Sequence, residues 1–442
     1  MDTKKCLKIV FSVVLSDAGE VTRAIEIADG IRSRCPEGYE LDIIFLSTGS
    51  RFEKKVISSG FKIYKCSPQL PGIGFREDFK TQGSNLIGDV KLAGELLKGE
   101  IDAFNELKPD FVIYGFNPIA GLARRMASRP IRGICYMPTP MQKDVYLTTL
   151  MKDVPDNIKP LAYLPISFRK GIIKLIPKSL KLKVPAFVQA NIIEALEKFH
   201  WNGEPVKTVF DMLKADLTII NDFKEFNKDH NLPHNFKVVG PLYAPSANDA
   251  TIDDNILKIF NPKNKKSKIF CTLGSSGDKE CLFQSIKALT QGVGKEWNAV
   301  ILAPPAVCPI EEARECAGNS TNVYITDEFV PAPLVNALAD IVVSHGGQGT
   351  IQTAIASGTP IVGFAMQPEQ QINLDNVMMS GSGIRIPKHK WNVKNIQIAI
   401  KNILKEPSYK ENIIVLKKSL ESTDGKKNSA LAIWEYILNE LN

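Results

Sequence analysis

The residues best suited to chemistry lie between His345 and Asn373. The stretch His345-Gly346-Gly347-Gln348-Gly349-Thr350 follows an apolar run, 340–344, and precedes a helical pattern that stops at Gly358-Thr359-Pro360. This order predicts a strand, a glycine turn and a helix. Glycines let the backbone approach a ligand closely, and the N–H groups at a helix start attract anions. Because ligands bind at the carboxyl ends of strands in open α/β sheets, we expect His345 to line an anion site.

Length and composition indicate a globular chain of two or three domains. Its 442 residues are 44% hydrophobic and 23% charged, which is ordinary for a soluble protein. The formal net charge of +7 is too small to predict nucleic-acid binding. The eight cysteines contain no Cys-x-x-Cys pair, which indicates reduced, cytosolic usage. No apolar run reaches the ~18 residues of a spanning helix. Lys4-Lys5 before the apolar residues 7–15 favours a first strand over a signal peptide.

Strand and helix patterns alternate through both halves of the chain. Runs such as Lys8–Leu15 and Phe111–Tyr114 predict strands in the first half, and a second alternating series begins at Lys268. Such alternation predicts parallel sheets with helices on both faces. The expected fold class is therefore α/β, with two Rossmann-like, doubly wound domains facing a cleft.

The expected domain boundaries follow composition. Residues 1–240 form the first domain and end at Gly240-Pro241. Residues 241–267 are rich in Asn, Asp, Lys and Pro and predict a linker. Residues 268–425 form the second domain, and 426–442 form a closing amphipathic helix.

The segment 169–183 interrupts this alternation. It contains Arg169, five lysines, no acidic residue and interleaved Ile and Leu residues. Such a segment suits an anionic membrane surface, so peripheral membrane contact through 169–183 is one hypothesis. The alternative is a solvated helical insertion packed on the first domain. Pro165, Pro177 and Pro185 limit any helix there to short pieces.

Three motifs together resemble a known donor-site signature. They are His345-Gly346-Gly347-x-Gly349-Thr350, Gly358-x-Pro360 and Glu369-Gln370-x-x-Asn373. The signature is that of the UDP-glucuronosyl and UDP-glucosyl transferases, nucleotide-sugar glycosyltransferases with two Rossmann-like domains in the arrangement called GT-B. The resemblance covers roughly 269–373 strongly, 8–32 weakly and the middle of the chain hardly at all. It implies that the closing helix packs back on the first domain.

The resemblance assigns donor-binding roles to the second domain. An imidazole, backbone N–H groups and hydroxyls would hold the diphosphate and stabilise charge on the departing nucleotide. These groups belong to His345, Gly347, Gly349, Thr350, Ser275 and Ser276. The alternative for His345 is a structural histidine that caps its own turn.

The sugar and the base would be bound by neighbouring residues. Glu369 and Gln370 would hold the sugar hydroxyls, since a carboxylate and an amide suit a polyol. Phe329 and Val330 would border the base. Thr353 stands where most relatives carry a Glu that binds both ribose hydroxyls. A threonine makes at most one weaker contact, so the preferred nucleotide stays open.

Glu20 is the first candidate for the general base. Many relatives have Gly-His at the start of the first helix and an Asp after a later strand, where this chain has Gly19-Glu20 and Gly115. Gly19-Glu20-Val21 resembles the Gly-Asp-Val of sterol and other lipid glucosyltransferases. Glu20 would then deprotonate an acceptor hydroxyl. The alternative is that Glu20 is only a favourable charge at a helix start. Asp17 is a second candidate base.

The segment 136–141 is similar to a Met-Pro loop near the acceptor in the sterol-type members. Met137, Pro138 and Met141 are therefore candidate contacts to an apolar acceptor. The alternative is a proline-rich surface loop with no ligand.

The predicted activity is inverting, metal-independent transfer of a sugar from a nucleoside-diphosphate sugar, with UDP favoured, to a hydroxyl of a small or lipid-like acceptor. No cofactor is expected, and the location is cytoplasmic or membrane-associated. The five histidines lack metal-ligand spacing, and neither an Asp-x-Asp nor a P-loop motif occurs. One alternative is a GT-B protein that binds a nucleotide sugar without catalysis, suggested by Thr353 and Gly115. The other is a sugar-nucleotide epimerase.

Overall fold

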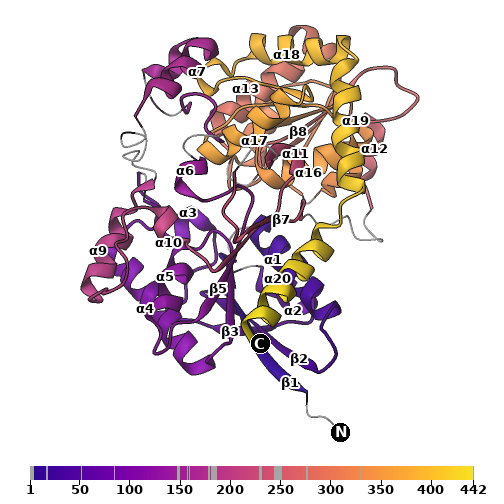
Figure 1. The fold of residues 1–442 in the computed structure, drawn as a ribbon. Helices are drawn as coiled ribbons and strands as arrows, with labels where there is room; N and C mark the ends of the chain where they lie inside the picture. Colours follow the sequence, from indigo (N-terminus) through magenta and orange to yellow (C-terminus); the bar gives the residue numbers. More distant parts are fainter. Residues whose placement is uncertain are drawn as a thin grey trace. The chain divides into compact units, whose positions relative to one another are not determined.

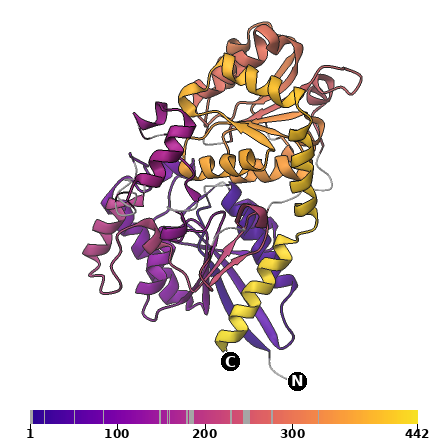
Figure 2. The ribbon, with the colours of Figure 1, turned by 45° about the horizontal axis from the view of Figure 1, so that its top comes forward.

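The chain folds into two compact units. The computed structural model describes residues 4–15, 18–50, 52–83, 85–146, 150–156, 158, 160–177, 180, 187–227, 231–242, 251–274, 277–328 and 330–441. Unit 1 comprises Met1–Thr149, Ile176–Ala244 and Asp424–Asn442, and unit 2 comprises Leu150–Leu175 and Pro245–Thr423. Each unit is a sheet covered by helices (Figures 1 and 2).

Unit 1 is built on a seven-stranded parallel sheet in the order β3-β2-β1-β4-β5-β6-β7. The strands are β1 Lys5–Phe11, β2 Tyr39–Ser47, β3 Lys62–Lys65, β4 Phe111–Tyr114, β5 Arg132–Met137, β6 Leu217–Ile220 and β7 Phe236–Val238. Strands β4 and β6 are buried along their whole length because helices cover both faces of the sheet. The strand order reverses between β1 and β4, so their carboxyl ends mark the crevice in which such sheets bind ligands.

The helices of unit 1 begin at sequence signals that satisfy their first N–H groups. The side chain of Asp89 accepts from Leu92 N at 2.6 Å, and Asn117 Oδ1 accepts from Ile119 N at 3.1 Å. The helices are α1 Ala18–Ser33, α2 Glu53–Ser58, α3 Phe75–Asp78, α4 Val90–Leu107, α5 Pro118–Met126, α6 Lys143–Val145, α9 Ala190–Lys198, α10 Val209–Met212, α11 Lys224–Asn227 and α20 Gly425–Leu441.

The closing helix α20 packs on α1 of unit 1, and the indigo and yellow ribbons lie side by side in both views (Figures 1 and 2). Ile433 and Ile437 are fully buried in the core of this unit. Trp434 Nε1 donates to the Ile31 carbonyl at 3.0 Å, and Lys426 pairs with Glu26 at 3.4 Å. Helix α20 therefore belongs to the same hydrophobic core as β1 and α1.

Unit 2 contains a six-stranded parallel sheet in the order β10-β9-β8-β11-β12-β13. Its strands are β8 Lys268–Thr272, β9 Asn298–Leu302, β10 Val323–Thr326, β11 Ile341–Ser344, β12 Ile361–Gly363 and β13 Gly383–Arg385. Its helices are α7 Ile166–Leu175, α12 Asp254–Ile259, α13 Lys279–Thr290, α14 Ile310–Ala317, α15 Ala332–Leu338, α16 Gln348–Ser357, α17 Pro368–Met379, α18 Val393–Lys405 and α19 Ser408–Glu421, with 3₁₀ turns η2 Leu161–Tyr163, η4 Gly292–Glu296 and η5 Lys388–Lys390. The order reverses between β8 and β11. The predicted class of two doubly wound α/β domains is confirmed.

One segment from the first half of the chain, Leu150–Leu175, belongs to unit 2. Asp153 accepts from Arg385 of β13 at 2.6 Å, although the two residues are 232 positions apart. Arg169 is fully buried and pairs with Asp153 at 3.1 Å and Asp156 at 2.6 Å. The segment therefore packs on the second unit, whereas the sequence patterns place it in the first domain. Arg169 lies in the interior, so it is not part of a membrane-facing surface.

No helix among the described residues is both long enough and apolar enough to cross a membrane.

Replacing Arg385 by Leu should destabilise unit 2, because Asp153, Asp156 and Asp375 would stay buried without this cation. Removing one partner of a buried ion pair costs about 3–5 kcal/mol. Urea unfolding measures the loss. Lys401→Leu, at an exposed position of α18, makes the same charge change and should stay within about 0.5 kcal/mol of the wild type. Equal stability of the two variants would contradict a structural role for the buried ion pairs.

Candidate active site

The donor-site motif of unit 2 forms the predicted strand–turn–helix. His345 is the first residue after the buried strand β11, Gly346 has a φ of 83°, and Gly347 is the N-cap of α16. Ser344 Oγ accepts from Gly346 N at 3.1 Å and fixes the turn. The N–H groups of Gly349 and Thr350 point out of the start of α16. Gly347 has no side chain that could accept from them, so the helix start favours an anion.

Two glycines make the space that the His345 imidazole occupies. A Cβ atom at Gly274, which follows β8 and has a φ of 60°, would lie 2.7 Å from Cε1 of His345. A Cβ atom at Gly347 would lie 2.8 Å from its Nε2. The imidazole is therefore held between the turns that follow β8 and β11. These two strands are neighbours where the strand order reverses.

Helix α17 is tied to this turn through Asn373. Its Nδ2 donates to the Gly346 carbonyl at 3.0 Å and to Glu369 Oε1 at 2.9 Å. Asn373 is 3% exposed, so this amide is a fixed part of the structure. The motif Glu369-Gln370-x-x-Asn373 thus sets the Glu369 carboxylate at a defined place beside the turn.

Two side chains that were predicted to contact the donor, Gln370 and Thr353, form hydrogen bonds within the protein. Gln370 Oε1 accepts from Met366 N at 2.9 Å and Gln367 N at 3.2 Å, which caps α17. The Thr353 hydroxyl donates to the carbonyls of its own helix, at Gly349 and, at 3.2 Å, Thr350. The predicted sugar contact of Gln370 and ribose contact of Thr353 stay predictions, and each hydrogen bond named here competes with the predicted one.

Four predicted site residues, Asp17, Ser275, Ser276 and Phe329, lie outside the described residues. Val330, the other residue predicted to border the base, is described and is 7% exposed.

Glu20 lies in the first turn of α1 in unit 1, beside the reversal between β1 and β4. Its carboxylate pairs with Arg23 at 2.7 Å, and its residue is 8% exposed. Tyr136 Oη, from β5, donates to the Glu20 carbonyl at 3.3 Å. The candidate base is therefore held by an ion pair on its own helix.

Gly115, which follows β4, leaves room for this carboxylate. A Cβ atom at position 115 would collide with Oε2 of Glu20 and with the Tyr136 ring. The two departures from the His and Asp of many relatives are thus sterically linked. The Glu20 side chain occupies space next to position 115, where the resemblance implies an Asp in many relatives.

A buried network follows the same two strands. Glu100 of α4 accepts from Ser12 Oγ at 2.8 Å and from Asn117 Nδ2 at 3.0 Å. Burial raises the pKa of Glu100 from its ordinary 4.5 to about 7, although both hydrogen bonds oppose the rise. The sequence motifs did not single out this acid. Its signal was a glutamate on the apolar face of α4, between Leu96 and Phe104.

The predicted acceptor residues lie at and after the end of β5. Met137 and Pro138 are buried, and Met141 is half-buried. Their contact with an acceptor stays a prediction.

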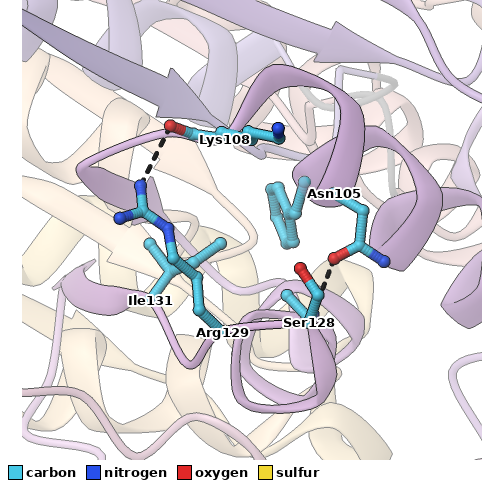
Figure 3. A pocket seen from close by; sticks show the side chains of 7 residues that line it. Asn105, Lys108, Ser128, Arg129 and Ile131 are labelled. Atoms are coloured by element: carbon cyan, nitrogen blue, oxygen red, sulfur yellow. Dashed lines mark hydrogen bonds between the residues drawn. The ribbon is translucent and has the colours of Figure 1, made fainter.

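A hollow of unit 1, shown in Figure 3, is lined by residues that precede β4 and β5 in the chain. It has a volume of about 390 Å³ and is lined by side chains from the end of α4 and the turn before β5. Arg129 donates to the Lys108 carbonyl at 3.2 Å, and Ser128 N donates to Asn105 Oδ1 at 2.6 Å (Figure 3). These two hydrogen bonds join the end of α4 to the turn before β5.

Among the described residues, no group of three or more His, Cys, Asp and Glu side chains is arranged to hold a metal ion.

A family model matches the region that carries the donor-site motif, and known glycosyltransferases match about half of the chain. Residues 309–425 match the family model described as Erythromycin biosynthesis protein CIII-like, C-terminal domain. The chain is 25% identical over 199 residues to a PGL/p-HBAD biosynthesis glycosyltransferase of Mycobacterium tuberculosis (strain ATCC 25177 / H37Ra), covering 45% of this chain and 42% of that protein. It is 24% identical over 246 residues to UDP-glucuronosyltransferase 2B1 of Rattus norvegicus, covering 53% and 43%. The chain therefore spans less than half the length of these relatives.

Solved structures match nearly the whole chain. The glycotransferase of kitacinnamycin covers 97% of this chain and 98% of its own, with a TM-score of 0.67 and 18% identity. The chain has the GT-B fold. A spinosyn rhamnosyltransferase complexed with thymidine diphosphate gives a TM-score of 0.60 at 12% identity, with 97% of this chain and 100% of that chain covered. The same enzyme complexed with the spinosyn aglycone gives 0.59 at 14% identity, with 97% and 99% covered.

These matches test two of the sequence predictions, the fold and the enzyme class. The GT-B arrangement inferred from the donor-site motif is confirmed. The relatives and the structures of this fold named above are glycosyltransferases, in agreement with the predicted enzyme class. The particular closeness to sterol and lipid glucosyltransferases stays a prediction.

Glu100→Gln should change how stability depends on pH. The pKa of Glu100 is higher in the folded state than in the unfolded state. Its contribution to the free energy of unfolding is therefore fully present below about pH 4.5 and is lost as the pH rises through about 7. The loss is on the order of 3 kcal/mol. The amide keeps the shape without titrating, so the variant should be the more stable protein above this window. Urea unfolding across the window measures the difference, with Glu95→Gln on the exposed face of α4 as control. Parallel pH profiles for wild type and Glu100→Gln would contradict the buried, neutral state of this acid.

Gly347→Ala should weaken binding of a nucleoside diphosphate, because the new Cβ would displace the His345 imidazole. Loss of one charge-assisted hydrogen bond corresponds to roughly tenfold or more in Kd. Titration calorimetry with UDP and thymidine diphosphate measures it. Gly171→Ala, where no atom lies within 4 Å of the added Cβ, is the matched control. Unchanged affinity in the Gly347 variant would remove His345 from the site.

Proposed function

We propose that the protein transfers a sugar from a nucleoside-diphosphate sugar to a hydroxyl group of a small or lipid-like acceptor, with inversion and without a metal ion. The observation that carries this proposal is the His345 turn. An imidazole enclosed by two glycine turns stands beside the start of α16, at the reversal of strand order in unit 2. This combination suits a pyrophosphate better than a neutral ligand.

The turn would act on the leaving group. As the bond between the sugar and the diphosphate breaks, negative charge grows on the phosphate oxygens. His345 and the N–H groups of Gly347, Gly349 and Thr350 would donate to those oxygens, with Ser275 and Ser276 contributing from the β8 turn. Donors already fixed in the folded protein need no reorganisation as the charge develops, so they stabilise the transition state.

Glu369 is the better supported of the two predicted sugar contacts. Its carboxylate is oriented by Asn373, while Gln370 Oε1 is engaged in capping α17. We propose that Glu369 accepts from sugar hydroxyls and that Gln370 acts mainly on the loop that carries it.

The nucleotide is proposed to be UDP or thymidine diphosphate. The Thr353 hydroxyl donates to its own helix, so the contact to a ribose 2′-hydroxyl that a Glu would supply is weak here. The spinosyn rhamnosyltransferase of the same fold was solved with thymidine diphosphate, whose sugar lacks that hydroxyl. We therefore expect little discrimination between ribose and deoxyribose donors.

Glu20 is the proposed base of unit 1. The acceptor oxygen would attack the anomeric carbon while its proton passes to the Glu20 carboxylate, and the diphosphate would leave from the opposite face. The Arg23 ion pair holds the carboxylate in place. Asp17 is the alternative base. For the acceptor, the apolar residues Met137, Pro138 and Met141 support an apolar group, and its identity stays open.

The proposal is tested with purified protein, a panel of UDP- and thymidine-diphosphate sugars and a set of hydroxylated acceptors. Glu20→Gln should lower kcat by about 10²–10⁴-fold, the usual contribution of a general base, and leave the Kd for the nucleotide unchanged. Glu95→Gln is the control for the charge change. Normal turnover in Glu20→Gln would exclude this base.

The same assay separates the alternatives. The buried Glu20–Arg23 pair also fits a GT-B protein that binds a nucleotide sugar without catalysis. Tight donor binding with neither transfer nor donor hydrolysis would favour that alternative. Conversion of the donor sugar with no acceptor present, followed by NMR, would indicate an epimerase.

A further inference from the structure

Helix α7 presents two faces of different chemistry. Arg169 and Ile173 point into unit 2 and are 0% and 5% exposed. Phe168 and Leu175 are 67% and 83% exposed, although both are large and apolar. They stand seven positions apart, which is about two helical turns, so they share one side of the helix.

Basic and aromatic residues border this side. Lys170 and Lys174 are exposed and one turn apart, and Gly171 between the two apolar residues leaves the surface flat. Tyr163 of the preceding η2 turn is 52% exposed. We define the α7 face as Tyr163, Phe168, Lys170, Lys174 and Leu175.

The α7 face cannot be buried by a simple rotation of the helix. Arg169, on the opposite side, is fixed by Asp153 and Asp156, and Asp153 is fixed in turn by Arg385 of β13. Turning α7 inward would pull a buried guanidinium away from its partners and leave the charges unpaired in the interior, which is strongly unfavourable. The apolar side is therefore held toward solvent.

The charge around α7 favours an anionic partner. Residues 157–193 contain seven basic side chains and no acidic one. The rest of the chain contains the other 48 of the 55 basic side chains and all 48 acidic ones, so its formal charge is zero. Apart from Arg169, which is buried and paired with Asp153 and Asp156, this excess belongs to the six lysines of the segment.

We propose that the α7 face docks on an anionic phospholipid surface. Phe168 and Leu175 enter the boundary between headgroups and acyl chains, and Tyr163 stays at the level of the headgroups. Lys170 and Lys174 lie along the surface and pair with lipid phosphates. Unit 2, which carries the candidate donor site, is then held at the membrane through this face. This goes beyond the proposed sugar transfer and does not require it.

The test is vesicle flotation of the full chain, with phosphatidylcholine alone and with phosphatidylcholine mixed with phosphatidylglycerol. The wild type should bind the mixed vesicles and bind phosphatidylcholine at least tenfold more weakly, since each lysine near an anionic surface contributes about fivefold. Replacing Phe168 and Leu175 by Ser should lower binding at least about tenfold. Replacing Lys170 and Lys174 by Gln should lower it at low salt and have little effect at high salt.

The matched control replaces Val415 by Ser and Lys418 by Gln on the exposed side of α19 in the same unit. It should bind vesicles like the wild type, and thermal unfolding should show that all variants are folded. Absence of wild-type binding to the mixed vesicles, or an equal loss in the control, would overturn the proposal. So would light scattering that shows self-association through Phe168 and Leu175. Because flotation uses neither donor nor acceptor, its outcome is independent of the proposed transferase activity.

Discussion

The close approach of two strand-to-helix turns around the His345 imidazole is the constraint on which the candidate site of unit 2 depends. Strands β8 and β11 are neighbours where the strand order reverses, and Gly274 after β8 and Gly347 after β11 both lie against the His345 ring. With a side chain at either Gly274 or Gly347, the ring would have to move. Asn373 then fastens the turn to α17 and, through Glu369, to the predicted sugar site. Glycine spacing, imidazole and carboxylate are thus parts of one arrangement.

Unit 1 follows the same topological rule with different chemistry. The turns after β1 and β4 converge on Glu20, Gly115 and the Ser12–Glu100–Asn117 network. Absence of a side chain at Gly115 is what allows the Glu20 carboxylate to lie where it does. In the proposed mechanism, the Glu20 carboxylate and Arg23, both on α1, would take the place of the His at the helix start and the Asp after a later strand that the resemblance implies for many relatives. A carboxylate has no tautomer to fix, so a partner on its own helix is enough.

Buried ion pairs hold the segment Leu150–Leu175 on unit 2. Two arginines and three aspartates lie almost fully inside unit 2, and each is paired. Desolvated ions are costly unless their geometry is satisfied, so the arrangement tolerates few alternatives. It fixes α7 on unit 2 and leaves its apolar side, Phe168 and Leu175, toward solvent.

The sequence by itself determined the fold class and the donor-site motif, because both depend on local patterns. Apolar runs and helical spacing are set by neighbouring residues, and the glycines after β11 act within a few positions of His345. Only the tertiary structure decided that Arg169 is buried, that Gln370 caps α17, that Thr353 bonds its own helix and that Glu100 lies behind two strand ends. The partners of Arg169 and Glu100 come from other elements, and a side-chain direction depends on the backbone around it. Asp153 and Arg385 are 232 positions apart and come together only when the sheet has formed. No local sequence pattern could therefore predict their contact.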